Sequence, residues 1–178
     1  MKIFILKHNI KEFKFYLQNE NDPLAMEAFS FDGKALGKNW KPFSVNLFKV
    51  KTKAEKSLRE DFNSSCFDIG LLFANNDISQ LVTGITTYVE VLPINTDDQR
   101  DFYFINVIRK IPALDFKDKS EIMDMYRSGD YKFSKDTIIN EMLFRDEVLT
   151  STYFATENFV NKVGEDLKGV YFKYVGNI

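Results

Sequence analysis

One local pattern occurs twice in this 178-residue chain, and it restricts the fold more than any other feature. Each copy has an apolar strand-like run, a polar residue able to cap a helix, an amphipathic stretch and a second strand-like run. Four apolar positions recur 81 residues later: Phe73, Ala74, Ile78 and Val82 correspond to Phe154, Ala155, Phe159 and Val163. The repeat predicts an α+β fold of mainly antiparallel sheet with a few short helices, containing two similar strand–helix–strand units.

The elements around this repeat follow from turn, cap and periodicity signals. Asn75 or Asn76 is expected to cap the first helix, and Asp118 or Ser120 another that ends at Gly129. The run 102–108 is expected to pair back on 86–92 as a long hairpin. Further strands are expected at Lys2–Leu6, Phe13–Leu17, Glu27–Phe31, Val45–Val50, Tyr131–Phe133, Ile138–Ile139 and Met142–Arg145, and a helix over Ala54–Phe62 behind the capping box Thr52-Lys53-Ala54-Glu55.

Length and charge narrow the class of protein. The length predicts a single domain over 1–178, with an N-terminal strand subregion over 1–35 as the one candidate subdivision. The 24 basic and 26 acidic side chains give a net charge of −2, without the basic excess of a nucleic-acid-binding protein. The N-terminal apolar run, Ile3-Phe4-Ile5-Leu6, is shorter than the about 7–15 residues of a signal peptide. We therefore expect a cytoplasmic protein without a membrane partner.

The residue types that most often perform catalysis are sparse. His8 is the only histidine and is interpreted as a surface residue at the end of the first strand. Cys66 is the only cysteine; an intrachain disulfide is excluded, and its apolar surroundings favour a buried structural role. Carboxylate pairs occur at Glu60-Asp61, Asp97-Asp98 and Glu121 with Asp124. Such a pair could perform proton transfer if burial separated the pKa values of its two carboxyl groups. We expect these carboxylates to be exposed on the surface instead.

Motifs for cofactors and metals are not found. The segment Gly33–Lys38 lacks the spacing of a phosphate-binding loop, and there is no zinc or calcium motif. We therefore predict no cofactor, no metal and no enzymatic activity. Trp40 is expected to hold the loop before the third strand, and Asn106 to enter a buried hydrogen-bond network. The acidic turn at the hairpin tip, Asp97, Asp98 and Asp101, is the candidate partner-binding site, because hairpin tips are exposed and can carry recognition.

Several of these motifs together resemble the eleventh-type immunity family of bacterial polymorphic toxin systems. The resemblance spans residues 40–174 and rests on core and turn residues. It is carried by Trp40-Lys41-Pro42, Phe67-Asp68-Ile69, Leu72–Asn75, Val89–Ile94, Phe102–Val107, Ala113-Leu114-Asp115, Leu143-Phe144-Arg145, Phe154–Phe159 and Leu167–Phe172. The helix caps depart from the family pattern, since Ala-Asn and Ala-Thr stand where the family has Val-Ser.

The resemblance implies a non-catalytic immunity protein that binds and neutralises a cognate toxin domain in the bacterial cytoplasm. Two alternatives stay open: a self-associating or regulatory protein-binding module, in which aromatic edge strands form a homodimer, and an acid-pair enzyme.

Overall fold

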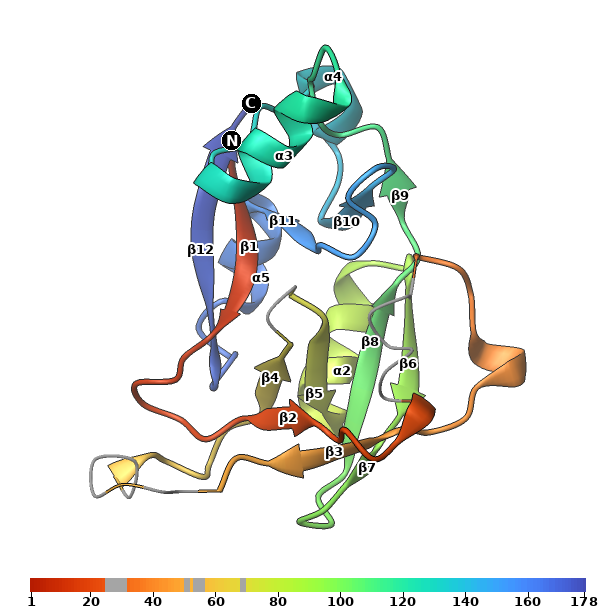
Figure 1. The fold of residues 1–178 in the computed structure, drawn as a ribbon, viewed down its shortest axis with the longest axis vertical. Coiled ribbons are helices and arrows are strands. Elements are labelled where there is room, and N and C mark those ends of the chain that lie inside the picture. The colour runs from red at the N-terminus through yellow and green to blue at the C-terminus, as the bar shows by residue number, and fades with distance from the viewer. Residues whose placement is uncertain (25–31, 50–51, 53–56, 68–69) are drawn as a thin grey trace.

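The computed structural model describes the chain except for residues 25–31, 50–51, 53–56 and 68–69 (Figure 1). The strands are β1 (Lys2–His8), β2 (Tyr16–Gln18), β3 (Ser44–Leu47), β4 (Ser64–Cys66), β5 (Leu72–Asn75), β6 (Val89–Pro93), β7 (Asn95–Thr96), β8 (Phe102–Val107), β9 (Lys110–Ile111), β10 (Leu143–Asp146), β11 (Phe154–Thr156) and β12 (Val170–Asn177). The helices are α2 (Asn76–Ile85), α3 (Lys119–Ser128), α4 (Lys135–Ile138), α5 (Glu157–Val163) and the short 3₁₀ helix η2 (Gly37–Asn39). The predicted α+β class is confirmed.

The strands form three sheets within the described part of the chain. Their orders are β12-β1-β11-β10-β9, β2-β3-β7 and β4-β5-β8-β6. Antiparallel pairing dominates, and only β9–β10 and β3–β7 are parallel among these pairs. The expected hairpin is present, with Val89 opposite Val107 and Pro93 opposite Tyr103.

The two repeat units have the same topology but lie in different sheets. In the first unit, β8 lies between β5 and β6 and is antiparallel to both. In the second unit, β1 takes the equivalent place between β11 and β12. Each unit is thus a strand–helix–strand crossover with a third strand inserted in its centre, which is a split βαβ arrangement. The N-terminal strand therefore belongs to the same sheet as the C-terminal strand.

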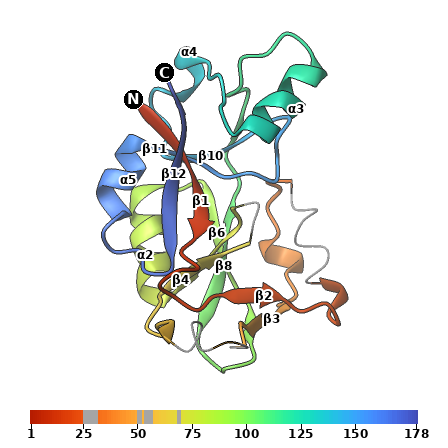
Figure 2. The ribbon, with the colours of Figure 1, turned by 60° about the vertical axis from the view of Figure 1, so that its left-hand side comes forward.

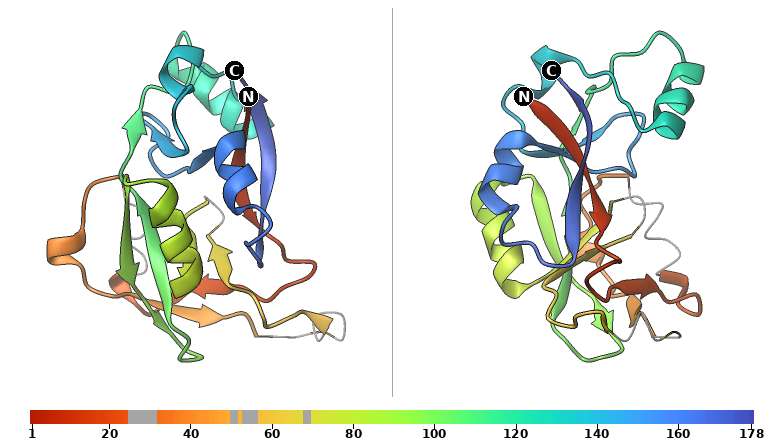
Figure 3. Two further views of the ribbon diagram at one scale, coloured as in Figure 1. Left: turned by 180° about the vertical axis from the view of Figure 1, so that it is seen from behind. Right: turned by 90° about the vertical axis from the view of Figure 1, so that its left-hand side faces the viewer.

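The helices of the two units cover the sheets from one side, where they lie next to each other (Figure 3). Asn75 caps α2 by accepting from the Ile78 N–H at 3.1 Å, and Thr156 caps α5 by accepting from the Phe159 N–H at 3.4 Å. These are equivalent positions of the repeat. The inward side chains Ile78 and Phe159 are both buried, so the amphipathic pattern places the same face of each helix on the core.

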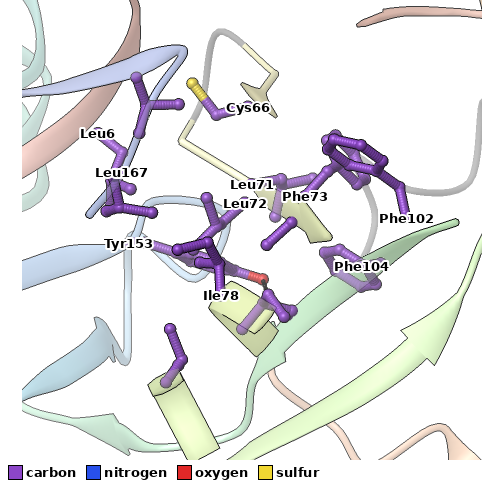
Figure 4. Close-up of a cluster of buried hydrophobic side chains, with 14 of the residues drawn as sticks. Leu6, Cys66, Leu71, Leu72, Phe73, Ile78, Phe102, Phe104, Tyr153 and Leu167 are labelled. Atoms are coloured by element: carbon purple, nitrogen blue, oxygen red, sulfur yellow. Dashed lines mark hydrogen bonds between the residues drawn. The ribbon is translucent and has the colours of Figure 1, made fainter. Parts of the chain in front are cut away.

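The main core is aromatic and lies between the sheets and these helices (Figure 4). The ring of Phe73 is 5.8 Å from that of Phe104 and 4.6 Å from that of Phe67. Cys66 is fully buried beside them, as predicted. A second, smaller cluster lies under α3 and includes Ile122, Met125 and Phe154. Phe154 and its repeat equivalent Phe73 therefore belong to separate clusters.

Several predicted elements differ from the structure. The strand expected over Glu27–Phe31 lies outside the described residues, as do Lys53-Ala54-Glu55 of the capping box. That helix does not continue to its expected end, because Arg59 donates its N–H to the Glu12 carbonyl at 2.8 Å and forms a parallel bridge with Phe13. Non-local backbone bonds replace a helix there.

Two further strand predictions are wrong near the second cluster. Ile138 ends the single-turn helix α4, where it is buried, while Ile139 is exposed. The segment 131–133 contains only an isolated bridge, between Phe133 and Leu114. Its Tyr131 N–H instead donates to the Val175 carbonyl in β12, at 2.8 Å. By contrast, Asp118, one of the two predicted caps, begins α3, and Gly129 ends it as predicted, in the left-handed region at φ 74°.

A buried guanidinium joins the two larger sheets. Arg145 in β10 has no exposed surface, and its Nε donates to the Val107 carbonyl of β8 at 2.6 Å. Its Nη2 donates to the Asn106 Oδ1 and to the Tyr153 hydroxyl, each at 3.0 Å. The Tyr153 hydroxyl in turn donates to the Ile105 carbonyl at 2.8 Å. Burial lowers the pKa of Arg145 and raises the pKa of Tyr153 to about 12.

We predict that Arg145→Met lowers the free energy of unfolding by about 3–5 kcal/mol, because it leaves buried carbonyl and hydroxyl groups without their donor. Urea denaturation measures this difference. Arg127→Met is the matched control, since Arg127 is exposed and pairs only with Asp124 on α3; it should change stability little. Equal effects of the two substitutions would contradict the structural role of Arg145.

Candidate functional site

The acidic turn between β6 and β8 has a defined backbone conformation. The Gln99 N–H donates to the Thr96 carbonyl at 3.2 Å, and the Thr96 hydroxyl donates to the Arg100 carbonyl at 2.7 Å. Gln99 has a φ of 62°, in the left-handed region that a non-glycine residue seldom adopts. The parallel pairing of β7 with β3 holds the start of the turn against the three-stranded sheet. The turn is therefore ordered before any partner binds.

Asp98 holds this turn on the aromatic core. The Tyr16 hydroxyl donates to Asp98 Oδ1 at 2.9 Å, and Arg100 Nε donates to Oδ2 at 2.6 Å. The guanidinium of Arg100 stacks 4.1 Å above the ring of Phe62 and donates to the Glu60 carbonyl. Partial burial of Asp98 acts to raise its pKa, but the bonds from Arg100 and Tyr16 outweigh it and lower the pKa. Burial of the Tyr16 hydroxyl and its hydrogen bond to the Asp98 carboxylate raise the pKa of Tyr16.

The other two acids of the turn are exposed. Asp97 Oδ1 accepts the Leu47 N–H at 2.6 Å, which fixes the direction of its carboxylate. Asp101 precedes β8 and is exposed. Of the three residues predicted to bind a partner, Asp97 and Asp101 are thus presented on the surface, whereas Asp98 has a structural role.

Apolar side chains lie directly beside Asp97. One depression of about 300 Å³ is lined by Leu47, Phe48, the carboxylates Asp97 and Asp98, and the lysines Lys14 and Lys49. A second depression of about 300 Å³ is lined by Leu17, Asn46, Leu47, Phe48 and Lys49. Leu17 is 44% exposed. Leu47 faces the core with Tyr16, whereas Leu17 and Phe48 lie on the outer face, and we call these two residues the apolar strip. The ring of Phe15 stacks on Phe48 with 4.9 Å between centroids and supports it from the side.

The sequence did not associate the apolar strip with the acidic turn. Tyr16 and Leu17 were expected only as strand residues, and the strand prediction alone does not say which other strands lie beside them. The local signal for an exposed Leu17 is the alternation of faces along a strand, which in the structure buries Tyr16 and exposes Leu17. In the β2–β3 ladder Leu17 lies opposite Asn46, and the Phe48 N–H donates to the Phe15 carbonyl one pair beyond Tyr16–Leu47, so Leu17 and Phe48 share the face opposite the buried Tyr16.

The carboxylates of two of the three candidate acid pairs, Glu60-Asp61 and Glu121 with Asp124, lie next to basic side chains instead. Glu60 bonds Lys14 and Asp61 bonds Arg59. Glu121 bonds Lys132, while Asp124 is near Arg127. The hydrogen bond from the basic partner lowers the pKa of Glu60, Asp61 and Glu121. The pKa values of Glu60 and Asp61 are thus both lowered, whereas an acid–base pair requires one pKa to be raised relative to the other.

The remaining singled-out residues pack against neighbours. The His8 ring is 4.7 Å from that of Phe15. Trp40 Nε1 donates to the Pro93 carbonyl at 2.7 Å, which attaches the loop to β6 as expected. Asn106 is buried and donates to the Lys34 carbonyl at 2.8 Å and to Glu90 Oε2 at 2.9 Å, confirming the predicted network. A cavity of about 830 Å³, larger than the depressions beside Asp97, is lined partly by Trp40.

Among the residues that the structure describes, no group of three or more His, Cys, Asp or Glu side chains could hold a metal ion. The helices outside the four undescribed segments are too short or too polar to cross a membrane. No protein-family model matches the chain, and no curated protein matches it.

We predict that Asp98→Asn lowers the free energy of unfolding by about 1–3 kcal/mol at pH 7, because the charged bond with Arg100 is lost. The lowered pKa means that the carboxylate stabilises the wild type above the unfolded value of about 3.9, and that this stability is lost as the pH falls through the folded pKa. The difference between the two proteins should therefore shrink below about pH 4. Urea denaturation at neutral and acidic pH measures it, and a difference independent of pH would contradict the assignment.

Proposed function

We propose that this protein is a cytoplasmic immunity protein that binds a cognate toxin domain and occludes it, without catalysis. The proposal draws on the resemblance of residues 40–174 to the immunity family. The observation that carries it further is the surface at the hairpin tip: two exposed carboxylates, Asp97 and Asp101, lie on an ordered turn beside the exposed Leu17 and the half-buried Phe48.

This combination has the features of a protein–protein interface. Interfaces have an apolar centre with a polar rim, and a few apolar anchors supply most of the binding energy. Leu17 and Phe48 would form the centre, and Asp97, Asp101 and Lys49 the rim. Because Asp98, Arg100 and Tyr16 already fix the turn, little conformational entropy is lost when it binds. The exposed carboxylates Asp97 and Asp101 would favour basic groups on the facing part of the toxin and accelerate encounter.

The function is tested by growth of a bacterial host that expresses the C-terminal toxin domain of the neighbouring large secreted gene product. Co-expression of this protein should restore growth, and the two proteins should co-purify. An unrelated toxin from another system is the control, and it should remain toxic. A neighbouring domain that is harmless, or that is toxic and unaffected, would contradict the proposal.

The rim is tested by Asp97→Asn with Asp101→Lys, which keeps the acceptor for the Leu47 N–H and leaves Asp98 in place. We expect the association rate constant with the toxin domain to fall about threefold to tenfold at low salt, and less at high salt, because steering charges are removed. Surface plasmon resonance measures it. The control is Asp124→Asn with Asp130→Lys, the same change in charge on and just beyond α3, at the opposite end of the molecule (Figure 1). Equal rates for the two variants would exclude the acidic turn from the interface.

The apolar strip should act on dissociation instead. Leu17→Arg is expected to raise the dissociation rate constant about tenfold or more, since a buried apolar anchor would be replaced by a charge. Leu17 is half exposed in the isolated protein, so its replacement should leave thermal unfolding nearly unchanged. An unaltered dissociation rate would place the contact elsewhere.

A further inference from the structure

We propose that two copies of this chain associate through the outer edge of β12, in antiparallel register with Phe172 on the two-fold axis. This surface lies in the other large sheet from the acidic turn, and the inference does not depend on the proposed function.

The edge of β12 is the longest available edge of its sheet. β12 is the terminal strand of the order β12-β1-β11-β10-β9, whereas the opposite edge, β9, has only two residues. Figure 2 shows β12 beside β1, with no further strand of its sheet beyond it. The Tyr131 N–H already binds the Val175 carbonyl, so the edge is partly covered at that end. Residues 170–174 are the part that can accept another strand, and unpaired edges of this kind are templates for strand pairing.

The direction of the backbone groups follows from the pairing with β1. The Asn9 N–H donates to the Gly169 carbonyl at 2.9 Å, directly beyond the pair His8–Val170. Antiparallel pairs alternate between hydrogen-bonded and non-hydrogen-bonded. Tyr171 and Lys173 therefore bond β1, and the N–H and C=O groups of Val170, Phe172 and Tyr174 point outward. These three residues supply the bonds to a second copy.

The side chains select one register. With Phe172 opposite Phe172 of the second copy, all three outward residues in each copy exchange backbone hydrogen bonds, because Val170 then faces Tyr174 of the second copy. Tyr171 faces Lys173 of the second copy, twice in the dimer. A shift by one residue in each copy in one direction places Lys173 opposite Lys173, and like charges directly opposite are destabilising. The shift in the other direction places Tyr171 opposite Tyr171 and leaves only Val170 and Phe172 of the three outward residues paired with each other. The favoured register instead sets an aromatic ring next to an ammonium group.

The exposure of these side chains agrees with an interface. Tyr171 is 48% exposed and Tyr174 is 50% exposed, on opposite faces of the strand. Tyrosine is enriched at interfaces. Pairing five residues per copy should bury less than the about 1,200 Å² of a stable complex, so the dimer is expected to be weak and concentration-dependent.

The register is tested with single cysteines in the full chain, because the native Cys66 is fully buried and does not compete. Tyr171→Cys and Lys173→Cys are prepared separately and mixed in equal amounts under mild oxidation. In the favoured register the two positions are a directly opposed, non-hydrogen-bonded pair, with about 4.5 Å between Cα atoms, which a disulfide can span. Each variant alone should stay monomeric on non-reducing gels, and the mixture should give a 171–173 disulfide by mass spectrometry. No disulfide in the mixture, or an equal yield from either variant alone, would overturn the proposal.

A second measurement needs no cross-link. Sedimentation of the wild type over a range of concentrations should show a monomer–dimer equilibrium. Tyr171→Lys places two lysines opposite each other across the axis and should weaken dimerisation about threefold to tenfold, while Tyr171→Glu should not weaken it. Thermal unfolding checks that both variants fold, because Lys7 of β1 also lies opposite residue 171. A wild type that is monomeric at all concentrations, or equal effects of Lys and Glu, would refute the interface.

Discussion

The buried guanidinium of Arg145 is the interaction on which the arrangement of the sheets depends. It lies in β10 of the five-stranded sheet but bonds the carbonyl of Val107 and the amide of Asn106 in β8 of the four-stranded sheet. Asn106 passes the connection on, because its amide also binds the Lys34 carbonyl and Glu90. A charge this deeply buried is tolerated only where its donors are satisfied, so the two sheets and the loop before η2 are restricted to one relative placement.

The local part of this fold could be read from sequence. Asn75, Asp118 and Gly129 act within a few residues of themselves, as caps or as a left-handed stop, and their positions were predictable from cap chemistry. The insertion of β1 between β11 and β12 was not, because that pairing joins residues at opposite ends of the chain. The helical turn at Ile138 was not predictable either. The two β-branched residues Ile138 and Ile139 favour a strand locally, but Ile138 is buried in the second cluster as part of a helical turn.

The candidate site shows the same division. A polar turn between two strands predicted an exposed acidic tip, and Asp97 and Asp101 are exposed. The structural role of Asp98 depends on Tyr16, which is distant in sequence and reaches it only through the pairing of β2, β3 and β7. The three neighbouring aspartates therefore have different roles, because contacts with residues distant in sequence distinguish Asp98 from Asp97 and Asp101.

The two proposed surfaces are compatible because they belong to different parts of the architecture. The acidic turn ends the β6–β8 hairpin at one end of the molecule, and β12 runs along the side of the other large sheet toward the chain termini (Figure 1). The two-fold axis through Phe172 would leave both acidic turns uncovered, so a dimer could hold two partner domains at once. Because the strand pairing is weak, the fraction of protein that is dimeric, and so able to hold two partner domains, would depend on protein concentration. A partner that binds both copies at once would stabilise the dimer by mass action.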